Sequence, residues 1–104
     1  MIGKIIIAPR RVPLHGVRVG EAHDWIRCEL CRSDVASGFR PGSWRDRNLT
    51  AIERCDLVST LAAGGHTKVA DEILATIDPS SSGDVYDAHR RAKLALNRAR
   101  RKGE

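Results

Sequence analysis

The apolar residues nearest the N-terminus follow the pattern of a short buried strand. The segment Gly3–Ala8 contains three consecutive β-branched isoleucines, and Pro9 ends the run. Val17 and Val19 alternate with polar or small neighbours and predict a second short strand. Together these segments predict a strand or hairpin region at the start of the chain.

The pattern over residues 21–36 fits two kinds of element. Ile26, Cys28 and Leu30 alternate with their neighbours, which suits a strand, yet the stretch contains neither Pro nor Gly, so a helix also fits. Residues 38–42 contain two glycines and a proline, which are typical of a loop. The sequence therefore leaves the element between residues 21 and 36 open.

The spacing of apolar residues becomes helical after this loop. Ser43 is expected to cap a helix that begins at Trp44 and runs to about Ala63, where Gly64 and Gly65 end it. The apolar residues of this helix lie around much of its circumference. They predict a central helix that is in contact on several sides.

Two more helices are predicted in the rest of the chain. Thr67 is expected to cap a helix with a single apolar stripe, which ends at Asp78 and Pro79. Asp84 is expected to cap the last helix, over residues 84–101. One arc of this last helix is mostly alanine, so the helix can approach a neighbour closely. The members of the arc are Val85, Ala88, Ala92, Ala95, Leu96 and Ala99.

These elements predict an α+β fold in a single small domain. Residues 1–42 form an irregular region with strands, and residues 43–104 form a three-helix region with a basic C-terminal helix. A chain of 104 residues with 41% hydrophobic residues can build one modest core, to which a metal or a partner would add stability. No apolar run approaches the roughly 18 residues of a membrane span. No signal peptide is recognised, and an odd number of cysteines argues against a secreted disulfide framework, so a cytoplasmic location is expected.

Charge is distributed unevenly along the chain. Residues 1–20 carry a net charge of +4, residues 21–87 carry −5 and residues 88–104 carry +6. Basic ends on an acidic body point to a polyanionic partner, with nucleic acid or a ribonucleoprotein as the expected class. The alternative is an ordinary solvated helix face. The candidate nucleic-acid contacts lie opposite the alanine arc and are Arg90, Arg91, Lys93, Arg98, Arg100, Arg101 and Lys102.

The sharpest local motif is His23-x4-Cys28-x2-Cys31. Two thiolates at this spacing can bind one Zn²⁺, and structural zinc takes four nitrogen or sulfur ligands, so Cys55 is the expected fourth ligand, with other histidines as alternatives. The motif resembles the zinc knuckles of ribbon and treble-clef modules. It differs from them because the chain has no second C-x2-C or H-x3-H pair, and no glycine follows Cys31.

Two other interpretations of the cysteine pair remain open. Both residues are ordinary buried thiols in one interpretation, because cysteine without a disulfide is among the most buried residue types. In the other they form a redox-active C-x-x-C pair. Such pairs place the first cysteine at a helix N-terminus, which the sequence around Cys28 does not predict.

No catalytic motif is present: the chain has no G-x-S-x-G, no phosphate-binding loop, no H-E-x-x-H and no G-x-G-x-x-G. We therefore expect a non-enzymatic accessory protein that binds nucleic acid or a nucleoprotein assembly through its basic ends. A protein–protein interaction module, such as a phage-encoded modulator or a small structural subunit, is the alternative, and a small thiol redox protein is the third. The 14 arginines against four lysines indicate a high-GC bacterial or phage genome.

Overall fold

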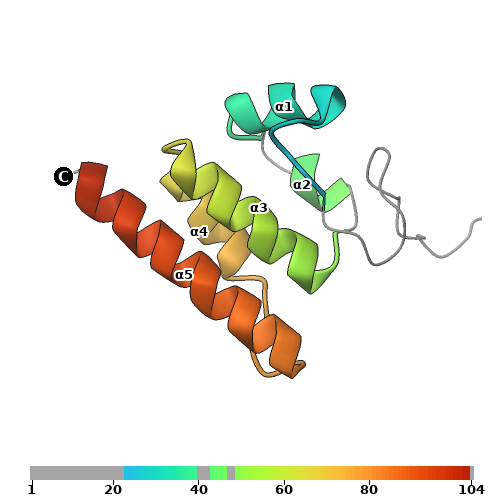
Figure 1. Cartoon of the computed structure of the whole chain (residues 1–104), viewed down its shortest axis with the longest axis vertical. Helices are drawn as coiled ribbons and strands as arrows, with labels where there is room; N and C mark the ends of the chain where they lie inside the picture. The colour runs from blue at the N-terminus through green and yellow to red at the C-terminus, as the bar shows by residue number, and fades with distance from the viewer. Residues whose placement is uncertain (1–22, 40–42, 47–48, 104) are drawn as a thin grey trace, which may run out of the picture.

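Helices make up the regular structure in the part of the chain that is described here. The computed structural model describes residues 23–39, 43–46 and 49–103, and these contain no strand. The helices are α1 (Glu29–Ala36), α2 (Ser43–Asp46), α3 (Ala51–Ala63), α4 (Thr67–Leu74) and α5 (Gly83–Gly103) (Figure 1).

The predicted α+β class is therefore wrong for the described residues. The strand predicted at Gly3–Ala8, and the second short strand after it, lie outside them. Within residues 21–36 the described chain forms a turn followed by α1, and not a strand. The burial pattern fits a helix and not a strand: Cys31 and Val35 are 0% and 5% exposed, whereas Ser33, which would share their face in a strand, is exposed.

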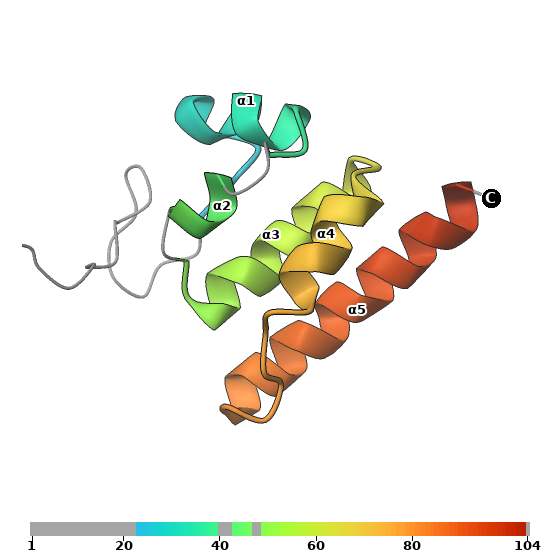
Figure 2. The same cartoon turned by 180° about the vertical axis from the view of Figure 1, so that it is seen from behind.

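α3 is the central helix, as the spread of its apolar residues predicted. Leu57, Val58 and Leu61 in α3 are each 0% exposed. α4 and α5 pack against α3 and contact each other. α1 and α2 lie on the side of α3 away from α5, and both views of the molecule show this arrangement (Figures 1 and 2). α3 thus lies between α1 and the basic helix α5.

The single helix predicted from Trp44 to Ala63 is two helices, and Thr50 explains the division. Thr50 has an extended backbone and is the N-cap residue of α3. Its Oγ1 accepts a hydrogen bond from the Glu53 backbone N–H (3.2 Å), and the Glu53 carboxylate accepts one from the Thr50 backbone N–H (2.8 Å). This capping box satisfies backbone donors that a continuous helix would have bonded internally, so a new helix begins here.

The predicted end of α3 at the glycine pair is confirmed. Gly65 has φ +87°, in the left-handed region that glycine enters without steric cost. The His66 N–H donates to the Leu61 carbonyl (2.9 Å) and the Gly65 N–H to the Ala62 carbonyl (3.0 Å), which is the Schellman pattern. α3 and α4 are thereby joined as antiparallel neighbours through a very short link.

The predicted caps of the last two helices are shifted by one or two residues. Thr67 is the first residue of α4, and the N-cap position belongs to His66, which makes no side-chain capping bond. In α5, Asp84 lies in the first turn. The cap is Ser82, whose Oγ accepts a hydrogen bond from the Val85 N–H at 3.1 Å.

The last helix itself is confirmed, together with its alanine arc. Ala92 is 0% and Leu96 is 1% exposed, and both belong to the core that α5 shares with α3 and α4. Ala95 and Ala99 are partly buried against the same core. Among the described residues no helix combines the length and the apolar character needed to cross a membrane.

Candidate metal centre

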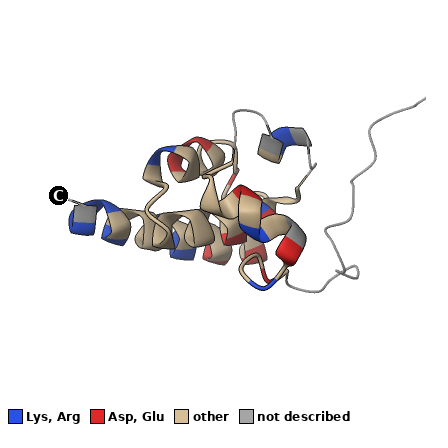
Figure 3. Cartoon of the chain, turned by 90° about the horizontal axis from the view of Figure 1, so that it is seen from above, with Lys and Arg blue, Asp and Glu red and all other residues tan. Residues whose placement is uncertain are grey.

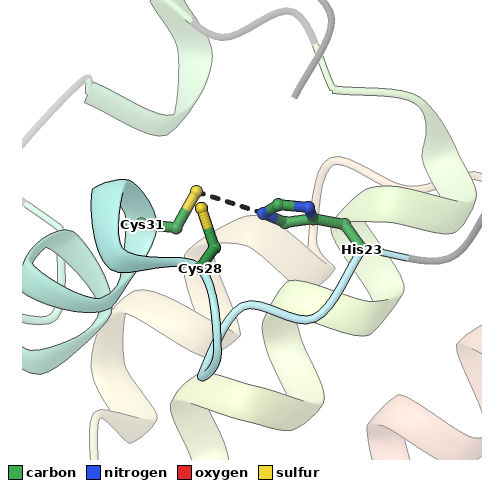
Figure 4. A group of neighbouring side chains, drawn as sticks. All are labelled: His23, Cys28 and Cys31. Carbon is green, nitrogen blue, oxygen red and sulfur yellow. Dashed lines mark hydrogen bonds between the residues drawn. The ribbon is translucent and has the colours of Figure 1, made fainter. Parts of the chain in front are cut away.

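Three side chains with metal-binding atoms converge beside the start of α1. His23, Cys28 and Cys31 each offer one ligand atom, and these atoms all lie within 4.8 Å of one another (Figure 4). The His23 Nε2 atom is 3.2 Å from the Cys31 Sγ atom. Ligand atoms around one tetrahedral zinc ion are about 3.6–3.8 Å apart, given bond lengths of about 2.1 Å to nitrogen and 2.3 Å to sulfur. The three side chains are therefore arranged closely enough to hold a single ion.

The start of α1 brings the two sulfurs together. Cys28 is the N-cap residue of the helix, with φ −70° and ψ 113°, and Cys31 is its third residue. Side chains at the N-cap and third positions lie side by side, which is the geometry that a capping box uses. The spacing C-x2-C therefore pairs two thiols because a helix begins at the first of them.

Asp24 organises the turn that leads into this helix, and sequence analysis missed it. Its Oδ1 accepts hydrogen bonds from the backbone N–H groups of Ile26 (3.1 Å) and Arg27 (3.0 Å). Its backbone carbonyl accepts one from the Cys28 N–H at 3.0 Å. An aspartate whose side chain accepts hydrogen bonds from the amides two and three residues onward commonly forms a turn. An aspartate four residues before Cys28 was therefore the sequence feature that could have predicted this turn.

The site is largely shielded from solvent. Cys31 is 0% exposed and His23 is 9% exposed, while Cys28 is half-buried. The His23 ring packs edge-on against Trp25, with ring centroids 4.9 Å apart and an interplanar angle of 88°. This contact limits the orientations of the imidazole and directs Nε2 toward the sulfurs (Figure 4).

Cys55, the fourth ligand expected from the sequence, is not part of this group of three. It lies in α3, is 2% exposed and lines a cavity of about 220 Å³ that His23 also lines. Burial raises the pKa of the Cys55 thiol, and the nearby Arg91 guanidinium opposes that shift in part. The structure thus brings together three of the four residues expected at the metal.

The same cavity gathers Cys55, Asp56 and Glu53, so it also bears on the expectation that the protein is not an enzyme. Burial raises the pKa of the Asp56 carboxyl as well as that of the Cys55 thiol. A thiol with a raised pKa stays protonated near neutral pH and is a poor nucleophile. The cavity is also smaller than the roughly 300–1,000 Å³ typical of small-molecule sites. The absence of enzymatic activity stays a prediction.

Cys28 has the placement of a redox-active cysteine, contrary to what its sequence neighbours predicted. The sequence did not predict a helix N-terminus at Cys28, yet Cys28 is the N-cap residue of α1. All three cysteines are in the described part of the chain, and none is in a disulfide. The C-x-x-C pair therefore has the placement found in thiol–disulfide motifs, in addition to a histidine neighbour.

The basic residues of α5 form a second surface, and one of them, Arg91, also lines the cavity that contains His23 and Cys55. All seven predicted nucleic-acid contacts are exposed: Arg90, Arg91, Lys93, Arg98, Arg100, Arg101 and Lys102. Among the described residues, Arg100 is the member of this set that forms an ion pair: its Nη2 atom lies 3.0 Å from Oδ1 of Asp71. Figure 3 shows basic positions along α5 and at its C-terminal end, whereas the acidic positions lie mainly on other elements and near the start of α5. Among the described residues, the other six bases of this set have no acidic partner within ion-pair distance.

Comparison with known proteins adds no further identification. The chain matches no known protein family, no curated protein and no solved structure.

Proposed function

We propose that this protein is a small non-enzymatic accessory protein that binds nucleic acid through α5 and holds a zinc ion at His23, Cys28 and Cys31. The observation that carries the binding function is the set of exposed bases on α5, of which Arg100 alone is paired with an acid among the described residues. Concentrated, unpaired arginine disfavours the folded state by self-repulsion and is the usual surface for phosphate contact. Nucleic acid supplies phosphates at regular intervals along such a surface.

Zinc is the metal that best suits the three ligand atoms. One imidazole nitrogen and two thiolate sulfurs are borderline-soft to soft donors, which favour Zn²⁺ over the hard cations Mg²⁺ and Ca²⁺. Three protein ligands leave the fourth tetrahedral position to water or to another group. The low exposure of His23 and Cys31 suits a structural role, in which the ion fixes the start of α1 against the core.

The test of the zinc proposal is the metal content of the purified protein and of two cysteine variants. We expect about one zinc per chain, measured by elemental analysis. Cys31→Ser should lose most of the metal, because a serine hydroxyl is a poor zinc ligand. Cys55→Ala should keep it, since Cys55 lies outside the ligand group. Equal metal loss in both variants, or no zinc in the parent protein, would contradict the assignment.

The nucleic-acid proposal is tested by affinity as a function of salt. Arg100 is engaged with Asp71, so at most six bases of α5 are available for phosphates. The slope of log K against log salt should then be steep, with an upper limit of about −5 for duplex DNA. A flat salt dependence would show that phosphate contacts do not drive binding.

Charge reversal separates α5 from the rest of the surface. The double variant Arg98→Glu with Lys102→Glu should weaken binding at least tenfold at about 0.1 M salt. The matched control, Arg32→Glu with Lys68→Glu, changes the net charge equally at exposed positions outside α5 and should have a much smaller effect. Circular dichroism should show that both variants keep the helical content. Equal losses in the two variants would mean that net charge alone attracts the ligand.

Thiol–disulfide chemistry is a second candidate function because Cys28 occupies a helix N-terminus. Oxidation would join the Cys28 and Cys31 sulfurs, releasing two protons and two electrons that reduce a small-molecule disulfide to two thiols. Incubation of the metal-free protein with oxidised glutathione, followed by mass spectrometry, tests it. A Cys28–Cys31 disulfide that forms at glutathione potentials near those of known oxidoreductases would favour this function. Persistent free thiols would exclude it.

A further inference from the structure

The exposed side of α5 is divided into three rows by the helices beside it. Arg98 and Lys102 face α3, where they line a groove of about 450 Å³ together with Ser59 and Ala62. Arg91 lines the neighbouring cavity on the same side. Arg100 faces the other way, toward α4, where it pairs with Asp71, and Lys93 lies two turns earlier on that flank.

A third row lies between these two flanks and points away from the protein. It consists of Arg90, Leu94, Asn97 and Arg101, which follow one another at intervals of four, three and four residues. At 100° per residue the four positions fall within an arc of about 60°. All four are exposed, and the apolar Leu94 is 52% exposed. Ala88, Ala92 and Leu96, which are buried, and Ala99, which is partly buried, occupy the opposite side of the helix.

From this division we infer that α5 enters the major groove of duplex DNA, with the outward row on base edges. The flank with Arg91, Arg98 and Lys102 contacts the phosphates of one strand, and Lys93 on the other flank contacts those of the second strand, while Arg100 keeps its ion pair with Asp71. The inference rests on the proposed nucleic-acid function and names its ligand. A helix with its side chains is about 10–12 Å wide, and the major groove of B-form DNA is about 12 Å wide. Bases on both sides of a central row match a groove that has a phosphate backbone on each wall.

The side chains of the outward row are those that read bases. Arginine donates two parallel hydrogen bonds to guanine, and asparagine forms a matching pair with adenine. An apolar side chain such as Leu94 can contact the methyl group of thymine. Arg90, Asn97 and Arg101 therefore carry the sequence preference, and the flanking bases set the register and most of the affinity.

The aromatic residues argue against single-stranded nucleic acid. Strands without a partner are bound largely by stacking of their bases on exposed aromatic rings. Trp25, Phe39 and Trp44 are 2–4% exposed, so bases cannot stack on their rings. Tyr86 is 57% exposed, but it lies in the first turns of α5 between Asp84 and Asp87, at the opposite end from the cluster of arginines.

Duplex RNA is disfavoured by its shape, and no described element obstructs α5. The major groove of A-form RNA is deep and too narrow for side chains to read. α1 and α2 lie beyond α3, and α4 is confined to one flank of α5, so the outward row is open along the helix (Figures 1 and 2). The described helices therefore leave the whole row accessible to a groove.

The experiment compares three ligands and three variants of the full chain. Fluorescence anisotropy measures affinity for a random-sequence duplex DNA, a duplex RNA and a single-stranded DNA of equal length. We expect duplex DNA to bind at least tenfold more tightly than either alternative. Leu94→Glu should weaken duplex binding at least tenfold. Its matched control, Ile26→Glu, makes the same change at a residue that is 55% exposed in the turn before α1, and should change affinity less than threefold.

Selection of preferred duplexes from the random pool tests base reading. Asn97→Ala should lower the affinity for the selected sequence about five- to 150-fold, and should change the affinity for the unselected pool little. Equal binding of all three ligands, or equal effects of Leu94→Glu and Ile26→Glu, would overturn the inference while the nucleic-acid function stands. A protein that selects no sequence and loses nothing in Asn97→Ala would overturn base reading by the outward row. No binding to any of the three ligands would refute the proposed function itself.

Discussion

Gly38 shows how a single residue connects the metal-binding segment to the helical core. It ends α1 in a Schellman pattern, in which the Gly38 N–H donates to Val35 (2.9 Å) and the Phe39 N–H donates to Asp34 (2.8 Å). Its φ of +75° lies in the left-handed region, and a Cβ atom at this position would be 2.9 Å from Nδ1 of His66. Glycine is therefore required for two reasons: the backbone is in the left-handed region, and His66 leaves no room for a Cβ atom.

Replacing this glycine should destabilise the protein. Gly38→Ala is expected to lower the free energy of unfolding by about 1–3 kcal/mol, because the left-handed backbone becomes strained and His66 must move. The control is Gly83→Ala in the first turn of α5, where an added Cβ meets nothing within 4 Å. That change should be neutral or stabilising by up to about 1 kcal/mol. Urea unfolding of both variants measures the difference, and a neutral Gly38→Ala would contradict the tight packing.

The thiol of Cys55 should be inert in the folded protein. Burial raises its pKa, so the protonated form persists at neutral pH and the folded state keeps its proton more tightly than the unfolded chain does. The resulting contribution to stability is present below the pKa of the unfolded thiol and is lost as the pH rises through the raised folded value. Alkylation followed by mass spectrometry should modify half-buried Cys28 first in metal-free protein. Rapid labelling of Cys55 at neutral pH would show that α3 opens locally.

The start of α3 shows how one cap defines an element. The capping box between Thr50 and Glu53 divides what reads as a single helix into α2 and α3. α4 has no such device, because its N-cap residue His66 makes no side-chain capping bond. Thr50 and Thr67 each lie at the start of a helix, but Thr50 caps its helix and Thr67 does not.

Replacing the threonine should destabilise the protein more at Thr50 than at Thr67. Thr50→Ala is expected to destabilise the protein by about 0.5–2 kcal/mol, since the Glu53 backbone donor loses its partner. Thr67→Ala, at the first residue of α4, should change stability by less than about 0.5 kcal/mol. Thermal or urea unfolding of the two variants gives the comparison. Equal costs would mean that the capping box does not set the start of α3.

The described part of the chain consists of a packed helical unit, α3–α5, and a smaller segment attached to it, which contains α1 and α2. α3, α4 and α5 contact one another extensively, whereas α1 and α2 form no comparable helix–helix interface. The segment with α1 is held instead by buried aromatic residues, among them Trp25 and Phe39, whose ring centroids are 6.4 Å apart. A metal ion at His23, Cys28 and Cys31 would bind the beginning of this segment to its helix.

Removal of zinc should therefore loosen one part of the molecule selectively. With a chelator present, hydrogen exchange should become faster in residues 23–36, while α3–α5 keep their protection, because their mutual packing does not involve the ion. The Cys31→Ser variant should show the faster exchange already and respond little to chelator. A uniform increase in exchange across the chain would show instead that the metal stabilises the entire fold.

The sequence by itself determined the elements whose signals are local. The alanine arc of α5 and the glycine pair after α3 gave correct helices because helical period and left-handed glycine depend on neighbouring residues alone. The C-x2-C motif with His23 likewise indicated the three side chains whose potential ligand atoms converge, because its spacing is a local property.

Only the tertiary structure decided the features that depend on distant residues. The local pattern of the segment that begins at Cys28 fits a helix and a strand equally well. Burial of Cys31 and Val35 in the shared core, with Ser33 exposed between them, fits only the helix. Cys55 lies outside the group of His23, Cys28 and Cys31 because of the way α3 packs. The number of residues between Cys31 and Cys55 does not predict that packing. The division of the α5 bases into two flanks and an outward row likewise exists only because α3 and α4 lie on either side of that helix.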